Sequence, residues 1–119
     1  MPDTPVSRTF GFILGTSPGT NNAITVERLA RAALDSGHRV MIFLLDDGIY
    51  NALHCMSNKS TIKGFQQLIP RGAEIAVCSN MAKARGLVES NASAGVIYAS
   101  LVYFSEMTST CDYLLAFTL

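Results

Sequence analysis

Cys78 is the residue in this sequence whose surroundings best fit nucleophilic chemistry. It follows an apolar run at residues 73–77, which has the length and residue types of a buried strand, and precedes a segment of helix-forming composition at residues 79–85. A thiol at such a junction lies near the unsatisfied N–H groups and positive dipole end of the helix, which favour the thiolate. Lys83 and Arg85 add positive charge within about two turns, unless they point to solvent. The pattern predicts a reactive thiolate.

An inert, buried cysteine is the competing interpretation of the same pattern. Cysteine is among the residue types most often found buried, where it behaves as a small apolar side chain. The position of Cys78 at the loop-facing end of a strand favours the reactive interpretation.

Cys55 is a candidate second thiol. It could attack a persulfide on Cys78 or close a disulfide with it, and a loop cysteine without a partner is the alternative. His54 is the histidine placed to meet Cys78, but a Cys/His hydrolase lacks an evident third residue to orient the imidazole. Cys111 opens a later strand, so we expect it at the opposite edge of the sheet in a structural role.

The length and composition indicate a single domain with few charged residues. The chain has 119 residues, which allows a single core, with a flexible lead-in at residues 1–8 and the domain at residues 9–119. Charged residues make up 15%, the formal net charge is zero and the mean hydropathy is +0.28. An apolar surface of this kind predicts an oligomer. The balanced charge argues against direct binding to nucleic acid.

The lengths of the apolar runs and the spacing of the cysteines bear on compartment and ligands. The apolar runs are too short to span a bilayer, and the first residues lack the apolar segment of a signal peptide, so we expect a cytoplasmic protein without membrane contact. Three cysteines without a CxxC motif do not resemble a disulfide framework or a zinc site. We therefore expect no metal and no cofactor.

Strand and helix patterns alternate along the chain. Apolar runs predict strands at residues 9–14, 39–45, 73–77, 96–99 and 111–118, and helical spacing or composition predicts helices at residues 23–36, 61–69, 79–85 and 101–107. This alternation predicts an α/β fold, in which helices cover both faces of a mainly parallel sheet.

In such open sheets ligands bind beyond the carboxyl ends of the strands, where three loops converge. The candidate binding residues on these loops are Gly15, Thr16, Gly19, Thr20, Asp47, Tyr50, Asn51, Ser79, Asn80 and Met81. The first loop lacks the lysine and glycine spacing of nucleotide cradles, so a turn that starts a helix is the better interpretation. Asp46 and Asp47 fit a solvated turn better than a pair of acids, and packing roles for Tyr50 and Asn51 are equally consistent with the sequence.

Five segments together resemble the DsrE/DsrF-like sulfur-relay family, closest to its DsrE/TusD branch. They are GTSPGTNNA, the GH after the first helix, DDGIYNA, AVCSNMAKARGL and ASLVYFSEMTSTCDYLLAF, and the resemblance extends over residues 10–117. It implies a three-layer unit with a parallel five-stranded sheet that assembles as trimers or hexamers. It also implies that Cys78 accepts sulfur as a persulfide, for tRNA 2-thiolation in the TusD-like branch or for sulfur oxidation in the DsrE-like branch.

Two hypotheses for function follow. The first is a cytoplasmic, sulfurtransferase-like carrier that takes sulfur on Cys78 from a donor protein and relays it to an acceptor protein, within a homo- or hetero-oligomer. The second is a catalytically inert oligomeric module that binds a small ligand or a partner, with Cys78 packed in the core.

Overall fold

Five parallel strands form one sheet in the order β4-β3-β2-β1-β5 in the computed structural model, which describes residues 6–52, 63–92 and 94–118. The elements in chain order are β1 (Thr9–Leu14), α1 (Asn21–Asp35), β2 (Arg39–Leu44), the 3₁₀ helix η1 (Asp46–Asn51), α2 (Lys63–Gln66), β3 (Glu74–Cys78), α3 (Ser79–Ala84), the 3₁₀ helix η2 (Glu89–Asn91), β4 (Ile97–Ala99), α4 (Leu101–Thr110) and β5 (Tyr113–Phe117). The predicted α/β fold and parallel five-stranded sheet are confirmed.

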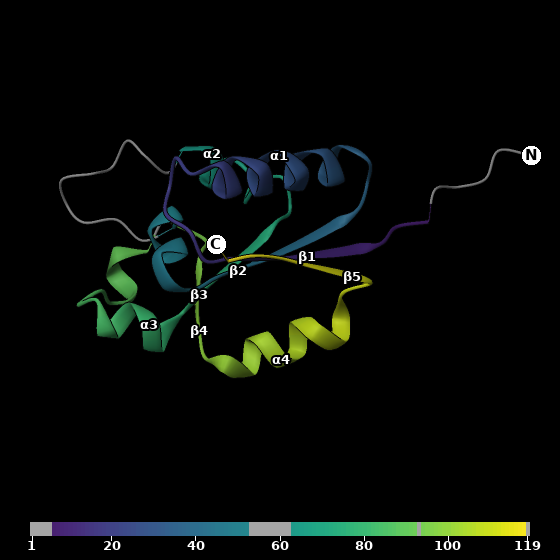
Figure 1. Ribbon diagram of the computed structural model, residues 1–119. Coiled ribbons are helices and arrows are strands. Elements are labelled where there is room, and N and C mark those ends of the chain that lie inside the picture. The colour runs from purple at the N-terminus through teal and green to yellow at the C-terminus, as the bar shows by residue number, and fades with distance from the viewer. Residues whose placement is uncertain (1–5, 53–62, 93, 119) are drawn as a thin grey trace, which may run out of the picture.

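Helices cover the two faces of the sheet separately, which gives three layers. α1 and α2 lie over one face, α4 lies over the other, and α3 begins where β3 ends (Figure 1). Thr20 caps α1 by accepting a hydrogen bond from the Ala23 N–H at 3.2 Å, and the chain leaves this helix through Gly37 at a φ of +84°.

The central strand β2 is apolar on both faces, as expected for a strand covered by helices on each side. Alternation along the strand sends Ile42 and Leu44 towards α1 and sends Met41 and Phe43 towards α4. The sheet therefore separates two apolar layers, which we name the α1-side layer and the α4-side layer. The buried members of the α4-side layer are Met41, Phe43, Ala76, Cys78, Ala99 and Met107.

The observed boundaries differ from the predicted ones at several element ends. Two helices differ by three residues at their carboxyl ends: α4 continues to Thr110 rather than ending at residue 107, and α2 ends at Gln66 rather than at residue 69. β3 runs from Glu74 to Cys78, one residue later than predicted, and this shift matters for the thiol. Within the predicted lead-in, the Ser7 hydroxyl donates to the Gly37 carbonyl at 3.2 Å.

Over the described residues, no helix is both long enough and apolar enough to cross a membrane. The same part of the chain holds no group of three or more His, Cys, Asp or Glu side chains suited to a metal ion.

Candidate functional site

Cys78 is the last residue of β3 and the residue before the first turn of α3. Its backbone is extended, with φ −72° and ψ 112°, and it pairs with Ala99 of β4. Strand alternation therefore places its side chain on the same face as that of Ala76, in the α4-side layer. Only 2% of Cys78 is exposed. The predicted strand-to-helix junction is confirmed, but in the single chain the thiol lies inside the core.

The α4-side layer that contains Cys78 is apolar and rich in sulfur. Met41 and Met107 are buried members of the same layer, and the ring of Phe43 stacks on the rings of Tyr103 and Phe104 at centroid distances of 6.0 and 5.7 Å. Thioethers are polarizable and rotate about several bonds, so they fill space without holding a fixed shape. Met41 and Met107 lie towards Cys111, at the other end of this layer, so they share the layer with the thiol without surrounding it.

Met81 connects this layer to the loop after β2. Its side chain is half-buried and packs against the layer that contains Cys78. Its Sδ accepts a hydrogen bond from the Asp46 N–H at 3.0 Å. Asp46 has a φ of +49°, a left-handed conformation that aspartate adopts more readily than most residues. Of the predicted binding residues, Met81 is the one that the structure connects directly to the thiol's surroundings.

The predicted positive charge near the thiol is directed elsewhere. The Arg85 guanidinium forms an ion pair with Asp47 at 3.3 Å and donates to the Met81 carbonyl at 3.4 Å. Lys83 is exposed to solvent. Neither of the two Arg85 contacts brings its charge to Cys78. The ion pair between Arg85 and Asp47 instead links α3 to η1.

Asn51 joins the first two loops at the carboxyl edge of the sheet. Its side chain is 2% exposed, and its Nδ2 donates to the carbonyls of Thr16 at 3.0 Å and Gly48 at 2.9 Å. A Cβ at Gly48 would lie 2.1 Å from the Leu14 carbonyl oxygen, so only glycine fits there. Sequence reasoning did not single out Gly48, although the Asp-Asp-Gly turn was the signal that could have done so.

The remaining predicted binding residues do not surround the thiol. Gly19 and Asn51, with Pro18 and Arg28, help to line a hollow of about 330 Å³ beside α1, whose lining does not include Cys78. On the first loop, the Thr16 and Thr20 hydroxyls lie 2.8 Å apart, and the Gly15 N–H donates to the Phe117 carbonyl. Tyr50 packs against the α1-side layer. After β3, the Ser79 carbonyl accepts from the Tyr98 hydroxyl, and Asn80 is exposed. The carboxyl edge therefore holds two separate regions.

The other cysteines and histidines fall elsewhere. His54 and Cys55 lie outside the described residues. Cys111 follows α4 at the opposite edge from Cys78, as predicted, with its Sγ 3.8 Å from the Met41 Sδ. Burial raises the pKa of the Cys111 thiol, which keeps it protonated. His38 also lies at that edge, where its Nδ1 accepts from the Arg8 N–H at 3.0 Å.

Comparison with known proteins identifies the family through one model. The model of the DsrE/DsrF-like family matches residues 9–117. The uncharacterized protein MK0008 of Methanopyrus kandleri is 34% identical over 86 residues, which cover 70% of this chain and 71% of that protein.

Two solved structures share the fold. The crystal structure of the ychN protein of E. coli has a TM-score of 0.78 at 20% identity, covering 94% of this chain and all of that one. The protein of unknown function MTH1491 of Methanobacterium thermoautotrophicum has a TM-score of 0.76 at 13% identity, covering 92% and 99%. With the family match over nearly the whole chain and the observed sheet, these findings establish that this chain belongs to the DsrE/DsrF-like family.

Proposed function

We propose that this chain is a sulfur-relay protein in which Cys78 accepts sulfur as a persulfide and passes it to a partner protein. The observation that carries the proposal is the position of Cys78, a free thiol at the end of β3, which matches the position implied for the sulfur-accepting cysteine in the DsrE/DsrF-like family. The family suggests a role of the sulfur-relay type, and the proposal narrows that role to one residue.

The proposed reaction is exchange at sulfur, with no net oxidation. The Cys78 thiolate attacks the outer sulfur of a donor persulfide, so that a new S–S bond forms on Cys78 while the donor's S–S bond breaks and leaves the donor as a thiolate. The acceptor thiolate then attacks the outer sulfur on Cys78 in the same way. Each transfer regenerates a thiolate, so neither a cofactor nor a metal is required.

Access to the thiol requires a movement, because the single chain covers it. Met81 is the side chain best suited to move, since it is half-buried, flexible and held in part by one hydrogen bond from the Asp46 N–H. A docking donor or acceptor protein that displaces Met81 opens a route to Cys78.

The partners in this proposal are a sulfur donor protein and a sulfur acceptor protein, met in the cytoplasm by an oligomer of this chain alone or with related chains. No direct contact with nucleic acid or membrane is part of it. The nature of the acceptor separates the two pathways, because tRNA 2-thiolation and sulfur oxidation require different acceptor proteins.

The burial of Cys78 favours a second candidate, an inert oligomeric module that binds a ligand or partner without sulfur transfer. A thiol that is 2% exposed among aliphatic and aromatic side chains is typical of a structural cysteine. The two candidates differ in whether native Cys78 ever meets an external sulfur atom.

Sulfur loading distinguishes these candidates. The protein is incubated with a cysteine desulfurase and cysteine, and intact mass is measured before and after reduction. On the relay proposal, wild type and Cys111→Ser gain reducible sulfur, on the peptide that contains Cys78, and Cys78→Ser gains none. If Cys78→Ser keeps the full load, the assignment to Cys78 is wrong. If the folded wild type gains no sulfur, the inert module is the correct account.

A further inference from the structure

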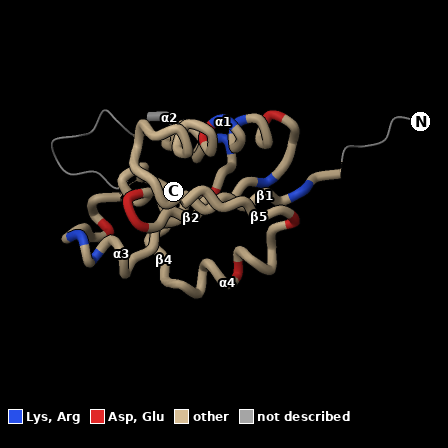
Figure 2. Tube along the Cα trace, viewed as in Figure 1, with Lys and Arg blue, Asp and Glu red and all other residues tan. Residues whose placement is uncertain are grey.

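The edge strand β5 has neither the charged residues nor the proline that often protect an exposed edge. It pairs with β1 on one side, and the strand order leaves its other side at the edge of the sheet. Its five residues, YLLAF, include no charge, proline or glycine, and Figure 2 shows the strand without a charged residue. Natural edge strands are usually interrupted by such residues because unpaired main-chain groups attract another strand.

Large apolar side chains of β5 are exposed on both faces of the sheet. The exposed fractions are 53% for Tyr113, 41% for Leu114 and 38% for Leu115. The pairing with β1 sets the faces, because Tyr113 lies beside Phe10, whose ring it stacks on at 5.1 Å, and Leu114 lies on the opposite face. Water thus reaches this strand from both faces as well as from its free edge, which favours burial against another strand.

We propose that β5 pairs antiparallel with β5 of a second copy of this chain, about a twofold axis at Leu115. The Phe117 carbonyl accepts from the Gly15 N–H at 2.9 Å, so alternation directs the main-chain groups of Leu114 and Ala116 away from β1, towards the free edge. An axis at Leu115 sets Leu114 opposite the partner's Ala116. In an antiparallel ladder such a pair exchanges two hydrogen bonds, and symmetry repeats them on the other side of the axis. The two five-stranded sheets become one.

The side chains of β5 match their own reversed order. On the face towards α1, the axis sets Tyr113 opposite the partner's Phe117 and Leu115 opposite the partner's Leu115. These are non-hydrogen-bonded pairs, in which side chains approach most closely, and aromatic or apolar pairs there are stabilising. On the other face a large Leu114 meets a small Ala116. This self-complementarity is the reason to choose a second copy rather than a foreign strand.

Charge does not oppose this contact. The carboxylate next to the strand, Asp112, is turned into its own chain, where it accepts from the Thr9 N–H at 2.7 Å. Two copies therefore meet along β5 without like charges on the paired strands.

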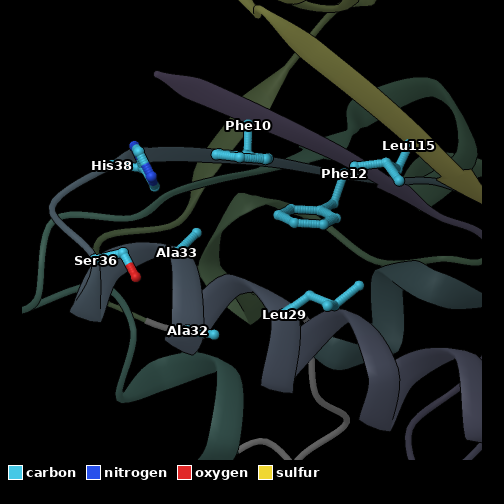
Figure 3. Close-up of a pocket in the computed structure, with 8 residues that line it drawn as sticks. All are labelled: Phe10, Phe12, Leu29, Ala32, Ala33, Ser36, His38 and Leu115. Carbon is cyan, nitrogen blue, oxygen red and sulfur yellow. The ribbon is translucent and has the colours of Figure 1, made fainter. Parts of the chain in front are cut away.

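The contact also completes a hollow that one chain leaves open. An apolar hollow of about 400 Å³ lies between α1 and strands β1 and β5, with Leu29 and Leu115 among the side chains that line it (Figure 3). A twofold axis perpendicular to the sheet keeps α1 of both copies on the same face. The partner's Leu115 and Phe117 then form a further wall, so the two hollows meet in one apolar groove.

Two variants test the pairing through the assembly mass, measured for the full chain by sedimentation velocity and light scattering. Ala116→Pro removes the main-chain donor that points to the partner, while the bonds to β1 remain. Leu115→Lys places two ammonium groups at the axis. We expect wild type to be an even multiple of the chain mass and both variants to have half that mass, with circular dichroism unchanged. An odd-numbered wild type, or a mass that a folded variant keeps, contradicts the proposal.

A control and a second readout make the test specific. Val102 is 65% exposed on α4, so Val102→Lys adds the same charge elsewhere and should keep the β5 contact. Under oxidising conditions, Leu115→Cys should form a disulfide with the same residue of the partner, seen as a linked peptide by mass spectrometry. Ala116→Cys, one residue along, should form this self-linkage far more slowly. Equal rates in the two variants would contradict the register. None of these readouts depends on the chemistry of Cys78.

Discussion

The two apolar layers on either side of the sheet differ in size and in chemistry. Among the described residues, the α1-side layer has eighteen buried members and none of them contains sulfur. The α4-side layer has six, and three of these are Met41, Cys78 and Met107. A large aliphatic and aromatic core is close-packed in one arrangement, whereas thioether side chains can rotate to fill a space whose shape has changed. The comparison indicates that the α1-side layer contributes most to stability, whereas the side chains of the α4-side layer can rearrange more readily.

The largest expected effect is a loss of stability in the α1-side layer. Ile42 is fully buried there, and Ile42→Ala should lower the free energy of unfolding by about 2–5 kcal/mol because it leaves a cavity. Met41, its neighbour on β2, faces the other layer, and Met41→Leu should cost less than about 1.5 kcal/mol. Urea denaturation measures both variants. Equal costs would show that the two layers do not differ as described.

A smaller effect, on reactivity, is expected in the α4-side layer. If Met81 covers Cys78 as proposed, Met81→Ala should raise the rate of Cys78 alkylation by iodoacetamide about tenfold, the equivalent of about 1.4 kcal/mol. Lys83→Ala, an exposed change on the same helix, is the matched control and should leave the rate unchanged. The rates are followed by peptide mass spectrometry. A rate in Met81→Ala equal to that of wild type would exclude Met81 as the cover.

The smallest expected effect is a change of stability with pH at the opposite edge. Burial raises the pKa of Cys111, so the folded chain keeps this proton after the unfolded chain has lost it. Stability from this group is therefore complete below about pH 8.5, the pKa of a free cysteine, and falls as the pH rises towards the folded pKa. Thermal unfolding from pH 7 to 10 should show a smaller decline in Cys111→Ala than in wild type. A decline as steep in the variant would assign the effect to other groups, such as Tyr103, whose pKa burial also raises.

The fold could be predicted because its signals are local. Apolar runs such as residues 39–45 exclude most alternatives to a buried strand, and their alternation with helical segments dictates parallel pairing. The exposure of Cys78 could not be predicted in this way. It depends on whether the strand ends at residue 77 or 78, because a residue that is still in the strand keeps its alternation and so lies on the same face as Ala76.

Contacts across the chain explain the rest of the difference. The bond from the Asp46 N–H to Met81 joins residues 35 positions apart, and the Asn51 amide spans the same separation to Thr16. No local pattern encodes such pairs, so the sequence predicted which loops meet at the carboxyl edge but not that Asn51 and Cys78 belong to different regions of it.

The left-handed backbone of Asp46 has a consequence for any opened form of the protein. It aims a main-chain N–H at the Met81 sulfur, which is a weak acceptor. In the opened form proposed above, Met81 is displaced and the Asp46 N–H loses its acceptor. An anionic sulfur species arriving in the vacated space would be a stronger acceptor than the thioether it replaces. The Asp46 N–H, which stabilises the closed position of Met81, would thus also stabilise an anionic sulfur in the open form.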